Sequence, residues 1–71
     1  MTPEDCHAKR NEFNAQAREA EQAGNPGLGN WCRLMASNML LMASDDPAKR
    51  ARGQAAYDKN KFRFERDMAR S

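Results

Sequence analysis

The chain has 71 residues and a net charge of only +2, although 31% of its residues are charged. This length allows one small domain, residues 1–71, which usually needs a staple or a partner to be stable. Two cysteines, no long apolar run and many charges of both signs exclude a disulfide-rich secreted protein and a membrane-spanning one. The start of the chain is acidic and polar, so we expect no signal peptide, reduced cysteines and a cytoplasmic location.

The first predicted helix covers roughly residues 3–23. Thr2 can cap it, and Pro3 suits the first helical position. One stripe of the helix then carries mostly small residues, Cys6, Phe13, Ala17 and Ala20. Such a stripe allows close approach to a neighbour but buries little apolar area. The segment 24–27, Gly-Asn-Pro-Gly, is expected to end the helix as a C-cap and breaker.

The second predicted helix covers residues 30–44, with Asn30 as its cap. Apolar residues spread over more than half of its circumference, so we expect it to be central and covered on several sides. Asn38 falls within the apolar arc. We expect it to be a buried asparagine bonded to backbone or to a second copy, with a register-fixing role as the alternative.

Methionines lie along the same helix beside Trp31. Met35, Met39 and Met42 are most simply core residues, because flexible thioethers fill irregular spaces well. The alternative is a groove that accepts a helix from a partner.

The third predicted helix covers residues 47–70, with Asp46 as its cap and Pro47 at its first position. Gly53 weakens it by roughly 1 kcal/mol relative to alanine. One stripe contains Ala48, Ala51, Ala55, Phe62 and Ala69. A second stripe, about 200° away, contains Tyr57, Phe64 and Met68. We expect the first stripe to pack on the other two helices and the second to be covered by another molecule, most simply a second copy.

A row of cations lies between the two stripes and contains Arg52, Lys59, Arg63, Arg66 and Arg70. Such a row can follow the phosphates of DNA or RNA. Acidic residues are interspersed, however, and the sequence has no helix-turn-helix, zinc or RNA-binding signature. A solvated helix face is therefore the simpler interpretation.

Catalytic and metal-binding patterns are absent from the sequence. Cys6 and His7 are adjacent in a helix and point about 100° apart, so they do not form a nucleophile–base pair. Together with Cys32 they lack the paired spacing of a zinc site. We expect no enzyme, no cofactor and no metal.

The sequence thus predicts an all-α protein of three helices, a hairpin or bundle completed by dimerisation. The predicted function is a non-enzymatic adaptor or inhibitor that binds a protein, a class that phages and plasmids often encode to block host or defence machinery. The predicted interface contains Tyr57, Phe64, Met68, Trp31, Met35 and Met39. The alternative is a basic accessory protein that binds DNA or RNA through the cation row.

Overall fold

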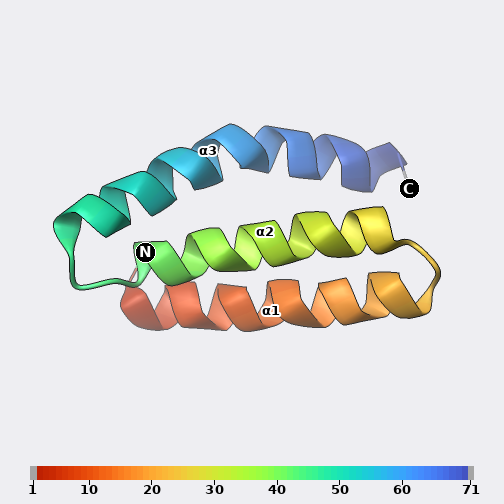
Figure 1. Ribbon diagram of the computed structural model, residues 1–71, viewed down its shortest axis with the longest axis horizontal. Coiled ribbons are helices and arrows are strands. Elements are labelled where there is room, and N and C mark those ends of the chain that lie inside the picture. The colour runs from red at the N-terminus through yellow and green to blue at the C-terminus, as the bar shows by residue number, and fades with distance from the viewer. Residues whose placement is uncertain (1, 71) are drawn as a thin grey trace.

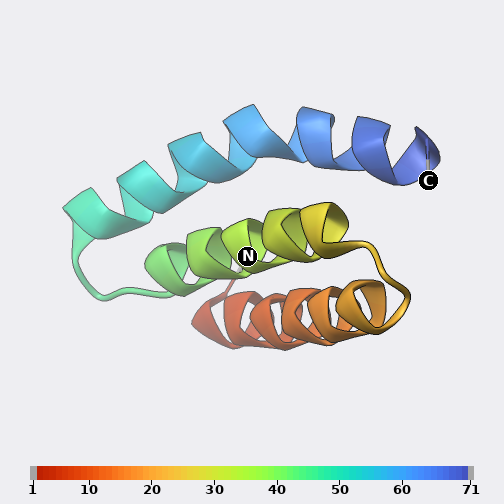
Figure 2. The same ribbon diagram turned by 45° about the vertical axis from the view of Figure 1, so that its right-hand side comes forward.

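The computed structural model describes residues 2–70, except for the side chains at 68 and 70. Over this range the chain forms three helices, α1 (Pro3–Gln22), α2 (Pro26–Met42) and α3 (Pro47–Arg70). α2 lies between the other two helices and packs against both, as Figures 1 and 2 show. The predicted all-helical fold is confirmed. None of these helices, as far as the chain is described, is both long and apolar enough to cross a membrane.

The starts of α1 and α3 follow the predicted capping pattern. The backbone N–H of Asp5 donates to Thr2 Oγ1 (3.1 Å), and the N–H of Thr2 donates back to Asp5 Oδ2 (3.2 Å). These bonds from the Thr2 backbone and side chain hold the pKa of Asp5 below its ordinary value. At α3 the N–H of Ala48 donates to Asp46 Oδ1 (2.9 Å). Both helices thus begin with a side-chain cap followed by proline.

The start of α2 differs from the prediction, which placed its cap at Asn30. The helix begins at Pro26, and its cap is Asn25, about 1.4 turns before the predicted cap. Asn25 Oδ1 accepts a hydrogen bond from the N–H of Leu28 (3.2 Å). Gly24 has a φ of 80°, so it can reverse the chain in a conformation that suits glycine. The Gly-Asn-Pro-Gly segment therefore ends one helix and also begins the next.

The core contains two clusters along α2. The Met35 cluster consists of Ala17, Cys32, Met35 and Phe64. The Met39 cluster consists of Cys6, Met39 and Met42. Met35 and Met39 are fully buried, in agreement with the core interpretation of the methionines, and the groove for a partner helix stays a prediction. Both cysteines are free and buried.

The face that α3 turns toward α2 is the opposite of the predicted one. Phe64 is only 8% exposed, and its ring meets the ring of Phe13 edge to face, with centroids 5.5 Å apart. Phe62, which was expected to pack inside, is 70% exposed. The alanines that share its stripe, Ala48, Ala51, Ala55 and Ala69, are exposed as well. The alanine stripe is therefore the outer surface of α3.

Gly53 explains this orientation. A Cβ atom at Gly53 would lie 2.7 Å from Leu41 Cβ and 2.9 Å from the backbone N of Met42, so α2 can approach only a glycine here. Tyr57 and Phe64, four and eleven residues later, lie within about 40° of Gly53 around the helix. Fixing the glycine against α2 thus turns both aromatic residues inward.

Asn38 lies beside the close approach of α2 to Gly53. It is 3% exposed, as predicted, but its Nδ2 donates to the sulfur of Met35 (4.0 Å), whereas the prediction was a bond to backbone or to a second copy. Its backbone oxygen lies 3.1 Å from the position that a Cβ on Gly53 would occupy. The polar side chain is therefore enclosed beside the close approach of α2 to Gly53.

Candidate nucleic-acid interface

The residues predicted to bind a partner are mostly core residues. Phe64, Met35 and Met39 are buried, and Tyr57 and Trp31 are half-buried against the core clusters. The side chain of Met68 lies outside the described part of the chain. The three buried side chains are unavailable to a partner unless the helices separate.

A different surface is the outer face of α3, which we define by its exposed residues: Ala48, Ala51, Arg52, Ala55, Lys59, Phe62, Arg63 and Arg66. These positions fall within about 120° of one another around the helix. In Figure 1, α3 is gently bowed with its convex side away from α2. The face is therefore an accessible ridge along one side of the molecule.

Four members of the predicted cation row lie on this face, Arg52, Lys59, Arg63 and Arg66. From the first to the last, they span about 21 Å of helix axis at about 1.5 Å per residue. Arg66 Nε forms an ion pair with Asp67 Oδ1 at 3.8 Å. The side chain of Arg70 falls outside the described part. The four cations are exposed, so their charge is accessible at the surface of α3.

Charge is distributed unevenly between α3 and the rest of the chain. α3 contains eight Lys and Arg residues against three Asp and Glu, whereas the remainder contains four against seven. The small overall charge of +2 therefore hides a basic helix attached to an acidic hairpin. A molecule with this asymmetry approaches a polyanion with α3 foremost.

Phe62 lies within the basic surface. It is one turn from Lys59 on one side and one turn from Arg66 on the other. Sequence reasoning missed its role because it grouped Phe62 with alanines as a packing stripe. The signal that could have corrected this is Gly53, which marks the side of the helix that another backbone approaches.

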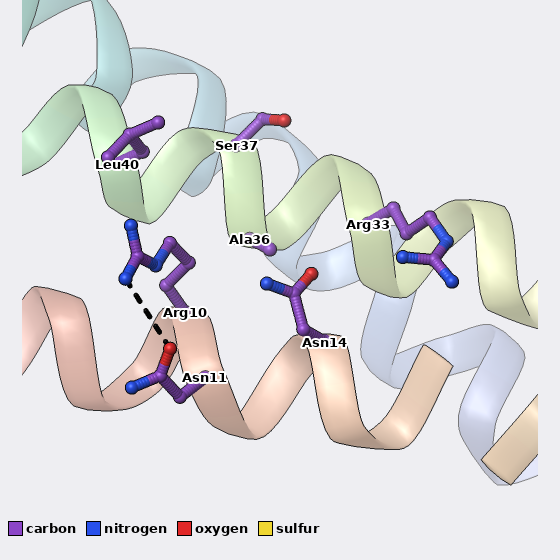
Figure 3. Close-up of a pocket in the computed structure, with 7 residues that line it drawn as sticks. All are labelled: Arg10, Asn11, Asn14, Arg33, Ala36, Ser37 and Leu40. Atoms are coloured by element: carbon purple, nitrogen blue, oxygen red, sulfur yellow. Dashed lines mark hydrogen bonds between the residues drawn. The ribbon is translucent and has the colours of Figure 1, made fainter. Parts of the chain in front are cut away.

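A hollow with a volume of about 380 Å³ lies between α1 and α2 (Figure 3). Its lining includes Arg10, Asn14, Arg33 and Ser37. The figure shows the Asn14 amide pointing toward Ala36 and the Arg10 side chain reaching toward α2. Arg33 Nη2 forms an ion pair with Glu21 Oε1 (2.6 Å). Of the two arginines that line the hollow, one is therefore already neutralised. This hollow suits a small anion less well than α3 suits a long one.

Metal and catalytic sites gain no support from the geometry. In the part of the chain that the structure describes, no three His, Cys, Asp or Glu residues are grouped to hold a metal ion. Cys6 is buried and the neighbouring His7 is exposed, so the two side chains lie in different environments.

Comparison with known proteins places the chain in no group: no family model, no curated protein and no solved structure matches it. The arrangement of its own side chains is therefore the basis for a function. The outer face of α3 is the surface on which charge and exposed aromatic area coincide.

Proposed function

We propose that this protein is a small non-enzymatic binding protein that contacts nucleic acid through the outer face of α3. The observation that carries the proposal is the exposed row of Arg52, Lys59, Arg63 and Arg66 on a helix that holds most of the positive charge. Lys and Arg side chains that neutralise phosphates release bound counterions, which drives association. A cytoplasmic location, where nucleic acid is abundant and thiols stay reduced, is part of the same proposal.

From the sequence, nucleic-acid binding was the alternative to a protein interface. The positions of the side chains in the fold now favour nucleic-acid binding. Three of the six side chains that supported a protein interface, Met35, Met39 and Phe64, are buried in the core, whereas four cations are exposed along one face of α3. Complementary charge also indicates which class of partner fits that ridge.

The test is a fluorescence-anisotropy titration with labelled single-stranded and duplex oligonucleotides at several salt concentrations. Four phosphate contacts predict a slope of log affinity against log salt of about −3.6 for duplex and about −2.8 for a single strand. The double variant Arg63→Gln/Arg66→Gln should lower affinity and flatten the slope. The matched control, Lys9→Gln/Arg18→Gln, removes the same charge from exposed positions on α1. Equal losses in both variants, or no salt-dependent binding at all, would contradict the proposal.

A second candidate function is protein contact through the same face, most simply with another copy of the chain. The observation that favours it is the exposed Phe62 within a row of exposed alanines. A dimer would enlarge the buried area of a small domain. The adaptor or inhibitor role would act through this surface as well. Sedimentation at high micromolar concentration separates the two: a mass of 8.0 kDa for the wild type would rule out the dimer, whereas a dimer that Phe62→Arg dissociates would support it.

A further inference from the structure

The two edges of the outer face of α3 carry opposite charges. Measured around the helix at about 100° per residue, the cation row lies on one side of Phe62. Asp58 and Glu65, both exposed, lie on the other side. Phe62 thus has the cation row on one side and two carboxylates on the other, with the exposed Lys61 one turn from each carboxylate.

This asymmetry conflicts with a helix inserted in the major groove of duplex DNA. A helix in that groove, which is about 12 Å wide, has a phosphate backbone on each side. On α3, one of those two backbones would face Asp58 and Glu65, and like charges would repel. A single strand has only one backbone, and it can follow the basic edge alone.

Phe62 gives that single strand a place for a base. Ring contacts among the described residues join Phe13 to Phe64 and Lys61 to Tyr57, and none of them involves Phe62. Its side chain is 70% exposed, so a base can reach it. Unpaired bases stack on exposed aromatic rings, and the stacking tolerates any sequence.

The spacing of the cations fits such a complex. Lys59 and Arg66 lie about 10 Å apart along the helix axis at about 1.5 Å per residue. That distance corresponds to about three phosphate spacings of a stacked strand, at about 3.4 Å each. A strand of about four successive phosphates would therefore reach from one cation to the other, with a base from its middle over Phe62.

We propose that the outer face of α3 binds single-stranded nucleic acid, with the backbone along the cation row and a base stacked on Phe62. This inference rests on the proposed nucleic-acid function and specifies its substrate. It requires no sequence preference, because the contacts are to phosphates and to the face of a base.

The experiment uses three labelled probes of equal length: oligothymidylate, an abasic oligonucleotide with the same phosphates, and a hairpin duplex. The wild-type chain should bind oligothymidylate more tightly than either of the other two. Phe62→Ala should weaken oligothymidylate binding by about 5- to 150-fold, the equivalent of about 1–3 kcal/mol for one stacked base. The same change should leave binding to the abasic probe unaltered, and Phe62→Trp should retain wild-type binding.

Leu40→Ala is the matched control, because Leu40 is 50% exposed on α2 and lies outside the cation row. Circular dichroism of each variant checks that the helices remain intact. Duplex binding as tight as oligothymidylate binding would overturn the inference. So would a Phe62→Ala variant that binds oligothymidylate like the wild type. If the wild type still binds in a salt-dependent way in either case, the proposed function stands and only the single-strand inference fails. If the wild type shows no salt-dependent binding to any probe, both the proposed function and the inference fail.

Discussion

The two helix–helix contacts of this protein are built differently. Small buried residues line the contact between α1 and α2, namely Ala17, Ala20, Gly29, Cys32 and Ala36. The contact between α2 and α3 combines one close approach at Gly53 with the bulky ring of Phe64. The first contact contains many small side chains, whereas the second contains Gly53, the half-buried Tyr57 and Phe64, whose ring also reaches Phe13 of α1. Substitutions at Gly53 and Phe64 should therefore have larger effects than a change at one of the small residues between α1 and α2.

The largest effect is expected for Phe64→Ala. Removing a buried phenylalanine costs about 3–5 kcal/mol, which is comparable to the total stability that so small a core supplies. Phe62→Ala should change the free energy of unfolding by less than about 0.5 kcal/mol, because an exposed side chain loses little packing. Urea denaturation followed by circular dichroism measures both. Equal destabilisation by the two variants would show that the assignment of inner and outer faces is wrong.

A smaller difference in stability is expected between alanine substitutions at Gly53, in the α2–α3 contact, and at Gly29, in the α1–α2 contact. Gly53→Ala should destabilise the protein by about 1–3 kcal/mol through overpacking, because its Cβ would meet the backbone N of Met42 at 2.9 Å. At Gly29 the nearest atom is Glu21 Cγ at 2.8 Å, on a side chain that can move, and the backbone O of Ala17 lies at 3.3 Å. Gly29→Ala should therefore cost less than Gly53→Ala, since its tightest contact can relax and alanine gains up to about 1 kcal/mol of helix propensity.

Thermal melting of the two glycine variants, with Gly27→Ala as the control, tests this difference. A Cβ at Gly27 would meet only Asn25 Oδ1, at an ordinary 3.8 Å. The control should be neutral or slightly stabilising. If Gly53→Ala melted at the same temperature as Gly29→Ala, the close approach of α2 to α3 would not be a constraint.

The smallest effect concerns the α1 cap and depends on pH. The pKa of Asp5 is lowered in the folded chain by its bonds to Thr2. The stability that Asp5 contributes is therefore present above the ordinary aspartate pKa of about 3.9, and it is lost as the pH falls through the lower folded value. Melting of the wild type and of Asp5→Asn between pH 6 and pH 2 should show a difference that shrinks toward acid. A difference that stayed constant over this range would contradict it.

Local signals in the sequence were sufficient for the helices themselves. Thr2-Pro3 and Asp46-Pro47 each combine a side-chain cap with proline, and both helices begin there. Asn25-Pro26 is the same signal, but the glycines beside it favoured the interpretation as a breaker. The start of α2 was therefore placed too late, although the residues that fix it lie next to one another in the chain.

The orientation of α3 could not be predicted in the same way, because it depends on contacts with another helix. Phe62 and Phe64 are equivalent in the periodic pattern, and four alanines on one stripe made that side look like the packing surface. The decisive residue is Gly53, whose missing Cβ matters only once Leu41 and Met42 lie against it. The cation row was recognised from the sequence, but Phe62 became part of that surface only when the helix orientation was known.

The two buried cysteines make it possible to measure how often each part of the core opens. Cys6 belongs to the Met39 cluster and Cys32 to the Met35 cluster, and both are buried. Burial raises the pKa of the Cys32 thiol, which keeps it protonated and slow to react in the closed state. An alkylating reagent would therefore modify each thiol mainly during transient local opening. In a variant that retains only one cysteine, the rate of alkylation reports how often the cluster around that cysteine opens. Comparing the rates of the two variants shows which cluster opens more often.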